Sequence, residues 1–324
     1  MDSAWKREEF SCPSTDGQTV LQGTLYRPMG KVRGLLQIVH GMTDYVGRYE
    51  PFMRQAAKCG YLAFGTDQLG HGRTGEMADS LGFIARRGGD RLLVEDVHAT
   101  ADYIRQKEGP ELPLFVFGHS MGSFVARLYA VQYGNELSGA IFCGTGYKVA
   151  FSGVGLCLAR CIRALRRDRA VSPALEKMMF GSYNKGTPGR TEYDWLTRDD
   201  AVVDAYVRDP WCTFHFTVPA ICDLVTLSRN CNKKNWFDAM PKSLPTLLVS
   251  GTADPVGDFS KGVSRVYDEL CARRMRDVTL RLFEGDRHEI LNELDRGEVI
   301  TYLLGWLQER TPGQEKQETE MGKG

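Results

Sequence analysis

The sharpest signal in the sequence is Leu114-Phe115-Val116-Phe117-Gly118-His119-Ser120-Met121-Gly122. Its apolar start predicts a buried strand, and residues 124–133 after it have a helical pattern. Between them, glycines two residues before and after Ser120 allow a tight turn that exposes the serine hydroxyl. The Gly-x-Ser-x-Gly pattern alone is weak, because a chain with 35 glycines can contain it by chance. Strand, turn and helix in this order predict that Ser120 is a nucleophile.

Short apolar runs bounded by glycine or proline predict further buried strands. They lie at residues 34–39, 61–65, 140–143, 246–249 and 278–283. Helical patterns lie between or after them, at residues 90–107, 122–133, 260–275 and 296–309. Strands that alternate with helices predict an α/β fold with a mainly parallel sheet and helices on both faces. An antiparallel hairpin is expected before it, over residues 7–26, with its turn at Asp16-Gly17.

The alternation stops between residues 148 and 240, where aromatic side chains crowd into a mostly helical or irregular pattern. We expect residues 148–240 to be an inserted, mostly helical lid that divides the α/β core into residues 1–147 and 241–311. Residues 312–324 contain almost no large apolar side chain and are expected to be a disordered tail.

The composition excludes several classes of protein. Forty-one basic residues balance forty-one acidic ones, which disfavours nucleic acid as a partner. Nine cysteines, scattered from Cys12 to Cys271, form neither a disulfide framework nor a zinc signature. The first residues show no signal peptide, and no apolar stretch is long enough to cross a membrane. We expect a cytoplasmic protein with free thiols.

A serine nucleophile needs a histidine that takes its proton and a carboxylate that orients the histidine. Where a serine sits on such a turn, the acid and then the histidine follow it along the chain, which leaves His215 and His288. His215 lies among aromatic residues of the expected lid, where a structural role is favoured. His288 follows the strand at 278–283, at the end of a parallel strand where ligands gather, and is the predicted base.

The acid is expected in the loop after the strand at 246–249. Asp254 lies there and is the predicted acid, with Asp258 and Asp286 as rivals that have alternative roles as loop caps.

The oxyanion of an acyl-transfer intermediate needs two amide donors, one from the residue after the nucleophile and one from an earlier loop. Met121 would supply the first and Met42, in His40-Gly41-Met42, the second. A metal role for His40 is the alternative, and the lack of a second histidine-carboxylate cluster argues against it.

These segments together resemble the monoacylglycerol lipases and lysophospholipase-like α/β-hydrolases, a group also described as serine aminopeptidase-like hydrolases. The resemblance covers about residues 10–310. It rests on His40-Gly41-Met42 with Arg48-Tyr49, on residues 67–73, 118–122 and 251–254, and on Arg287-His288-Glu289. It implies an α/β-hydrolase fold, a triad of Ser120, Asp254 and His288, oxyanion amides from Met42 and Met121, and no cofactor.

The chain departs from the family pattern at three places. Asp44-Tyr45 stands where relatives commonly have Glu-His, Thr74 where they often have Ser, and Ser123 where a further Gly follows the motif. These positions leave the expected triad intact. They mean, however, that the resemblance alone does not define the substrate of this chain. Asp67, His71 and Arg73 are expected to brace the floor of the site rather than to take part in the chemistry.

The expected lid contains an apolar run at residues 149–162 followed by several arginines. Such a helix either covers the pocket or makes transient contact with a membrane surface. Cys157 and Cys161 share a face of it and are expected to be buried apolar side chains, since two thiols make no zinc site.

The residues favour a serine ester hydrolase that acts on small, lipid-like esters such as monoacylglycerols or lysophospholipids. A prolyl-type aminopeptidase would use the same triad and would need an acidic anchor such as Glu192, Asp194 or Asp204. A non-catalytic binding protein would show a degenerate triad, and none is visible.

Overall fold

The computed structural model describes residues 4–147 and 169–312. An eight-stranded sheet with the order β1-β2-β4-β3-β5-β6-β7-β8 forms its centre. The strands are β1 (Trp5–Pro13), β2 (Val20–Pro28), β3 (Gly34–Val39), β4 (Tyr61–Thr66), β5 (Leu114–His119), β6 (Gly139–Cys143), β7 (Thr246–Gly251) and β8 (Val278–Phe283). β1 and β2 pair antiparallel, β2 pairs antiparallel with β4, and the remaining neighbours pair in parallel.

The hairpin and the strands agree with the prediction from sequence. Gly17 has a φ of 76° in the β1–β2 turn, and the Asp16 carboxylate accepts hydrogen bonds from the amides of Gln18 and Thr19. Every residue of β3 and β5 is buried, as expected for parallel strands that are covered on both faces.

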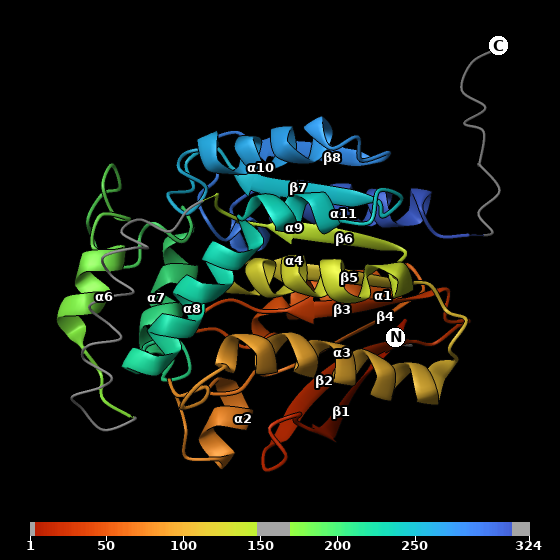
Figure 1. Cartoon of the computed structure of the whole chain (residues 1–324), viewed down its shortest axis with the longest axis horizontal. Helices are drawn as coiled ribbons and strands as arrows, with labels where there is room; N and C mark the ends of the chain where they lie inside the picture. Colours follow the sequence, from red (N-terminus) through yellow and green to blue (C-terminus); the bar gives the residue numbers. More distant parts are fainter. Residues whose placement is uncertain (1–3, 148–168, 313–324) are drawn as a thin grey trace.

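Helices cover the two faces of the sheet (Figure 1). The α-helices are α1 (Glu50–Lys58), α2 (Gly72–Met77), α3 (Gly89–Glu108), α4 (Met121–Tyr133), α6 (Pro173–Phe180), α7 (Asp200–Arg208), α8 (Val218–Cys231), α9 (Lys234–Ala239), α10 (Lys261–Ala272) and α11 (Arg296–Glu309). Short 3₁₀ helices span Val46–Tyr49, Gly134–Glu136 and Ile290–Asn292. One core cluster contains residues of α3, α4, α8 and α10, and a second contains residues of α1 and α11. The fold is therefore the predicted α/β-hydrolase fold.

The periodicity of α3 explains its packing. Leu93, Val97, Ala101 and Ile104 recur at three- and four-residue steps and are all buried. The helix ends at Gly109, whose φ of 127° suits glycine.

The segment expected as a lid contains α6 to α9 among its described residues. In Figure 1, α6, α7 and α8 gather at one end of the sheet. Buried α8 residues such as Leu224 and Leu227 belong to the same core cluster as α3 and α4. The start of this segment, with the apolar run, Cys157 and Cys161, lies outside the described residues, as do residues 313–324 of the expected tail. Within the described chain, no helix has the length and apolar character needed to cross a membrane.

Candidate active site

Ser120 occupies the turn between β5 and α4. Its backbone has a φ of 54° and a ψ of −121°, a conformation that residues other than glycine rarely adopt. The flanking glycines make this turn sterically feasible. A Cβ at position 118 would lie 2.4 Å from the carbonyl oxygen of Gly122, and a Cβ at position 122 would lie 2.1 Å from that of Val39. The sequence pattern therefore has a steric basis in this chain.

His288 and Asp254 meet at the ends of β8 and β7. The Nδ1 atom of His288 lies 2.9 Å from Oδ1 of Asp254, and both side chains are buried. Nε2 of His288 is buried and has no hydrogen-bond partner among the described residues. Ser120 and His288 line the same cavity, whereas Asp254 is buried against Nδ1 of His288 and does not line it.

The environment of Asp254 favours its carboxylate form. Burial alone would raise its pKa, but the charge and hydrogen bond of His288 outweigh burial, so the pKa lies below its usual value. The Val256 amide donates to Oδ1 at 2.8 Å, and the Ser250 hydroxyl donates to Oδ2 at 3.0 Å. An ionised Asp254 is suited to hold the Nδ1 proton of His288. Sequence reasoning did not identify Ser250, although it directly precedes the predicted Gly251–Asp254 segment.

The rival residues have other partners. His215 is exposed, and its Nδ1 lies 2.6 Å from the carboxylate of Glu176 at the edge of the cavity. Asp286 is buried and forms an ion pair with Arg198. Asp258 lies in a turn where its amide donates to the carbonyl oxygen of Pro255. The geometry thus favours Asp254 over both other acids.

The loop after β3 lies beside Ser120. A Cβ at Gly41 would lie 3.2 Å from the Cβ of Ser120, so glycine lets this loop approach closely. Met42 and Met121, the residues predicted to supply oxyanion amides, both line the cavity.

His40 has a structural environment. It is buried, and its Nε2 accepts a hydrogen bond from the amide of Gln68 at 2.9 Å. Among the described residues, the groups with metal-ligand spacing do not include His40.

The predicted floor of the site has the expected internal hydrogen bonds. Asp67 accepts hydrogen bonds from the amides of Val46 and Arg73, each at 2.9 Å. His71 is buried, and burial lowers its pKa to about 3, so its ring is neutral. None of Asp67, His71 and Arg73 is among the residues that line the cavity.

A buried ion-pair network of Arg48, Asp44 and Glu289 lies next to the candidate site. Arg48 donates to both carboxylate oxygens of Glu289, at 2.7 and 2.6 Å, and to Asp44 at 3.2 Å. Asp44 also accepts from the Tyr49 hydroxyl at 2.6 Å and from the Gly41 amide at 3.2 Å. Burial is the largest single effect and opposes its ionisation, but the charge of Arg48, together with the charge of His40 and the Tyr49 hydrogen bond, outweighs it and lowers the pKa of Asp44 to about 2. The network connects the loop after β3 to Glu289, the neighbour of His288.

His119 links the same network to the backbone of His288. Its Nδ1 lies 3.0 Å from the Tyr49 hydroxyl, and its Nε2 lies 3.1 Å from the carbonyl oxygen of His288. Burial, reinforced by the nearby His288, lowers the pKa of His119 to about 4. Sequence reasoning quoted Arg48, Tyr49 and Glu289 only as family markers. The sequence does not indicate that Arg48 and Glu289 meet, because they lie 241 positions apart in the chain.

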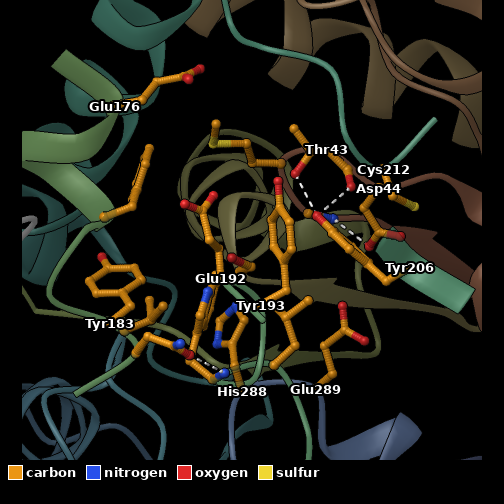
Figure 2. Close-up of a pocket in the computed structure, with 18 of the residues that line it drawn as sticks. Thr43, Asp44, Glu176, Tyr183, Glu192, Tyr193, Tyr206, Cys212, His288 and Glu289 are labelled. Carbon is orange, nitrogen blue, oxygen red and sulfur yellow. Dashed lines mark hydrogen bonds between the residues drawn. The ribbon is translucent and has the colours of Figure 1, made fainter. Parts of the chain in front are cut away.

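The cavity has a volume of about 750 Å³, within the usual range for small-molecule sites. Figure 2 shows Tyr183, Glu192 and Tyr193 on its wall, between Glu176 and His288. The ring of Trp195 lies 5.1 Å from that of His288 and 5.1 Å from that of Tyr183. Six aromatic residues of the segment expected as a lid line this cavity: Phe180, Tyr183, Tyr193, Trp195, Tyr206 and Phe214. In contrast, Phe216, Trp236 and Phe237 are buried in the core.

Comparison with known proteins gives concordant matches over most of the chain. The model of a family described as serine aminopeptidase, S33, matches residues 30–295. The monoacylglycerol lipase of Mycolicibacterium smegmatis is 27% identical over 309 residues, which cover 93% of this chain and 97% of the relative. The monoglyceride lipase of Mus musculus is 28% identical over 302 residues, which cover 92% and 89%.

A solved structure of a thermostable carboxyl esterase from Bacillus coagulans, in complex with glycerol, superposes with a TM-score of 0.89 at 27% identity. The match covers 94% of this chain and 99% of the esterase. A monoglyceride lipase from Saccharomyces cerevisiae, in complex with a substrate analogue, has a TM-score of 0.76 at 20% identity and shares the fold. It is matched over 96% of this chain and 97% of its own.

Proposed function

Because the chain belongs to the serine aminopeptidase S33 family and is a serine hydrolase, we propose that it cleaves single acyl chains from monoacylglycerol- or lysophospholipid-like esters. In this proposal Ser120 is the nucleophile, His288 the general base and Asp254 the residue that orients His288. The observation that carries it is the cavity that Ser120 and His288 share with an aromatic wall.

The first half-reaction follows from the positions of these groups. As the Ser120 Oγ attacks the ester carbonyl, its proton passes to Nε2 of His288. This nitrogen has no hydrogen-bond partner among the described residues, so it is free to accept the proton. Asp254 accepts the Nδ1–H hydrogen bond at 2.9 Å and stabilises the imidazolium that forms. The amides of Met42 and Met121 would hold the oxyanion. When the C–O bond breaks, the imidazolium returns the proton to the leaving alcohol, and the acyl group stays on Ser120.

Water completes the cycle. It attacks the acyl-enzyme while Nε2 of His288 takes a proton from it. The second oxyanion then collapses, the bond to Oγ of Ser120 breaks, and the imidazolium returns its proton to Oγ as the carboxylic acid leaves.

The lipid-like substrate class is supported by the cavity wall. Trp195, Tyr183 and Phe214 line the cavity that Ser120 and His288 share, and an acyl chain loses water-exposed area against such a wall. Hydrolysis rates on a 1-monoacylglycerol, a lysophosphatidylcholine and the 4-nitrophenyl ester of the same acyl chain test this. Faster hydrolysis of a short, water-soluble ester than of all three would contradict the proposed substrate class.

An aminopeptidase is the second candidate, and one observation favours it. Among the three acids considered as amine anchors, Glu192 lines the cavity. Asp194 is buried and accepts from the amides of Arg190 and Thr191, whereas Asp204 pairs with Arg190. Glu192 is therefore the residue on which a substrate ammonium group would depend.

Prolyl- and alanyl-arylamides with a free amine distinguish the two candidates. If they are cleaved faster than the monoacylglycerol, and if Glu192→Gln removes that activity while ester hydrolysis continues, the peptidase is the correct function. Equal effects of Glu192→Gln on both substrates would contradict an amine anchor.

A further inference from the structure

Part of the segment expected as a lid is hydrogen bonded to the loop that carries His288. The amide of Glu289 donates to the carbonyl oxygen of Leu196 at 2.7 Å, and the amide of His288 donates to that of Trp195 at 3.4 Å. The Thr197 hydroxyl donates to the carbonyl oxygen of Asn292 at 3.0 Å. Residues 194–199 thus form a support for this loop.

Arg198 lies at the centre of the contact between these two segments. Its backbone amide and its Nε both donate to the carboxylate of Glu293, at 3.0 and 2.9 Å. Its Nη2 donates to Asp286 and, at 3.3 Å, to Asp295. Asp286 and Glu293 are fully buried, so one guanidinium compensates two buried carboxylates and a third at the surface.

Asp286 connects this cluster to both loops of the candidate triad. It precedes His288 by two residues, and its carbonyl oxygen accepts a hydrogen bond at 2.9 Å from the amide of Ala253, the neighbour of Asp254. Its Oδ2 is buried without a hydrogen-bond partner in the described part of the chain. Burial and the charges of Glu293 and Asp295 raise its pKa to about 7, whereas Arg198 opposes this rise.

We propose that Arg198 is a positioning residue for His288, through which the inserted segment fixes the base relative to Asp254. The inference rests on the proposed function, because it presupposes that His288 is the base. Arg198 does not line the cavity and therefore acts through Asp286 and Glu293 rather than on the substrate. By this inference, residues 194–199 belong to the catalytic framework.

Three variants test the proposal. Arg198→Met removes the cation and keeps an unbranched apolar chain, and Arg198→Lys keeps the charge but loses the fork of donors. Arg296→Met is the matched control, since Arg296 joins the same two segments through Asp199 at 3.0 Å without contacting Asp286. Each variant is assayed well below its unfolding temperature for kcat, KM and the rate of fluorophosphonate labelling, and the downfield proton resonance of the His288 Nδ1–H is recorded.

The proposal predicts that Arg198→Met lowers kcat and the labelling rate together by about 10- to 100-fold, as expected for misplacement of a catalytic group, with KM changed less than twofold. It also predicts a shifted or lost Nδ1–H resonance, partial recovery in Arg198→Lys and little effect of Arg296→Met. A kcat within twofold of the parent protein, or an unchanged resonance in Arg198→Met, would overturn it.

The proposed function fails in a different way from this inference. If Ser120→Ala still labels or His288→Ala keeps its activity, the triad itself is wrong. If both variants are inactive while Arg198→Met is unimpaired, only the role of Arg198 is refuted.

Discussion

Nδ1 of His288 lies 2.9 Å from Oδ1 of Asp254, although 34 positions separate them in the chain. The Val256 amide and the Ser250 hydroxyl hold the same carboxylate. A carboxylate fixed by these two donors keeps the ring of His288 in one orientation and stabilises one tautomer.

Asp254→Asn tests this relationship. The Asn side-chain amide should favour the wrong tautomer of the His288 ring. We therefore expect kcat to fall by about 10⁴-fold while the fold is retained. Asp286→Asn is the comparison. It changes the rival acid through which Arg198 acts, so kcat should fall by no more than the loss of about 10- to 100-fold expected of Arg198→Met. Hydrolysis of a 4-nitrophenyl ester measures both. An active Asp254→Asn together with an inactive Asp286→Asn would show that the acid has been assigned wrongly.

Ser120→Ala should remove turnover, with a loss in kcat on the order of 10⁶-fold, because no other hydroxyl occupies the turn. The intact mass of the parent protein should increase by one adduct after treatment with a fluorophosphonate, and that of the variant should not. Ser123→Ala is the control, since the Ser123 hydroxyl donates to the carbonyl oxygen of Ser120 within the same helix turn. Labelling that persists in Ser120→Ala would place the nucleophile elsewhere.

Local patterns predicted the parallel sheet because each buried strand and each helix consists of contiguous residues with its own hydrophobic pattern. The turn at Ser120 followed for the same reason, since its glycines lie two residues away and their steric role is local. The predicted helix at 296–309 coincides with α11, and the helix at 260–275 is shorter by a few residues in α10, where Arg274 adopts a positive φ after its end.

The supports of the site were not predictable in this way. Arg48 and Glu289 lie 241 positions apart in the chain. They meet because Arg48 follows β3 and Glu289 follows β8, and the carboxyl ends of these parallel strands lie on the same side of the sheet. Arg198 and Asp286 are joined by the path of the inserted segment, for which the sequence offers no periodicity. The cavity-facing and core-facing aromatic residues, such as Phe214 and Phe216, alternate on a loop and could not be separated by pattern.

Arg48→Met should destabilise the protein strongly. It leaves Asp44 and Glu289 buried without their cation, and loss of one partner of a buried ion pair costs about 3–5 kcal/mol. Arg54→Met is the matched control, since Arg54 and Glu50 form an exposed pair on α1 for which about 0.5 kcal/mol is expected. Urea unfolding measures both free energies. Similar losses in the two variants would contradict a buried, desolvated network.

The stability of the protein should depend on pH through Asp286. Its pKa of about 7 in the folded protein lies above the ordinary value, so the folded state holds the proton more tightly than the unfolded state. The carboxyl group therefore costs nothing below about pH 4, and its ionisation weakens the fold progressively as the pH rises to about 7.

Asp286→Asn removes this ionisation. Its free energy of unfolding relative to the parent protein should therefore rise by about 2 kcal/mol between pH 5 and pH 8, less than the full linkage value because Arg198 is partly exposed. Urea unfolding of both proteins across this range gives the difference. A difference that is constant with pH would show that Asp286 ionises normally.

The aromatic wall predicts how activity depends on acyl-chain length. Each methylene buried against Trp195, Tyr183 or Phe214 contributes about 0.8 kcal/mol, so kcat/KM should rise by up to about fourfold per methylene until the cavity is filled. Longer chains should then be cleaved more slowly. A series of 4-nitrophenyl esters from acetyl to hexadecanoyl measures the profile.

Phe214→Ala should flatten the rising part of this profile, because it removes apolar surface from the cavity and leaves Ser120 and His288 in place. Phe216→Ala is the matched control, since Phe216 lies in the core, where its loss should lower stability by about 3–5 kcal/mol without changing the preferred chain length. A profile that is flat from acetyl to decanoyl in the parent protein, combined with faster cleavage of an alanyl-arylamide, would exclude acyl-chain recognition and favour the aminopeptidase. In that case Glu192, rather than the aromatic wall, would determine which substrates the cavity accepts.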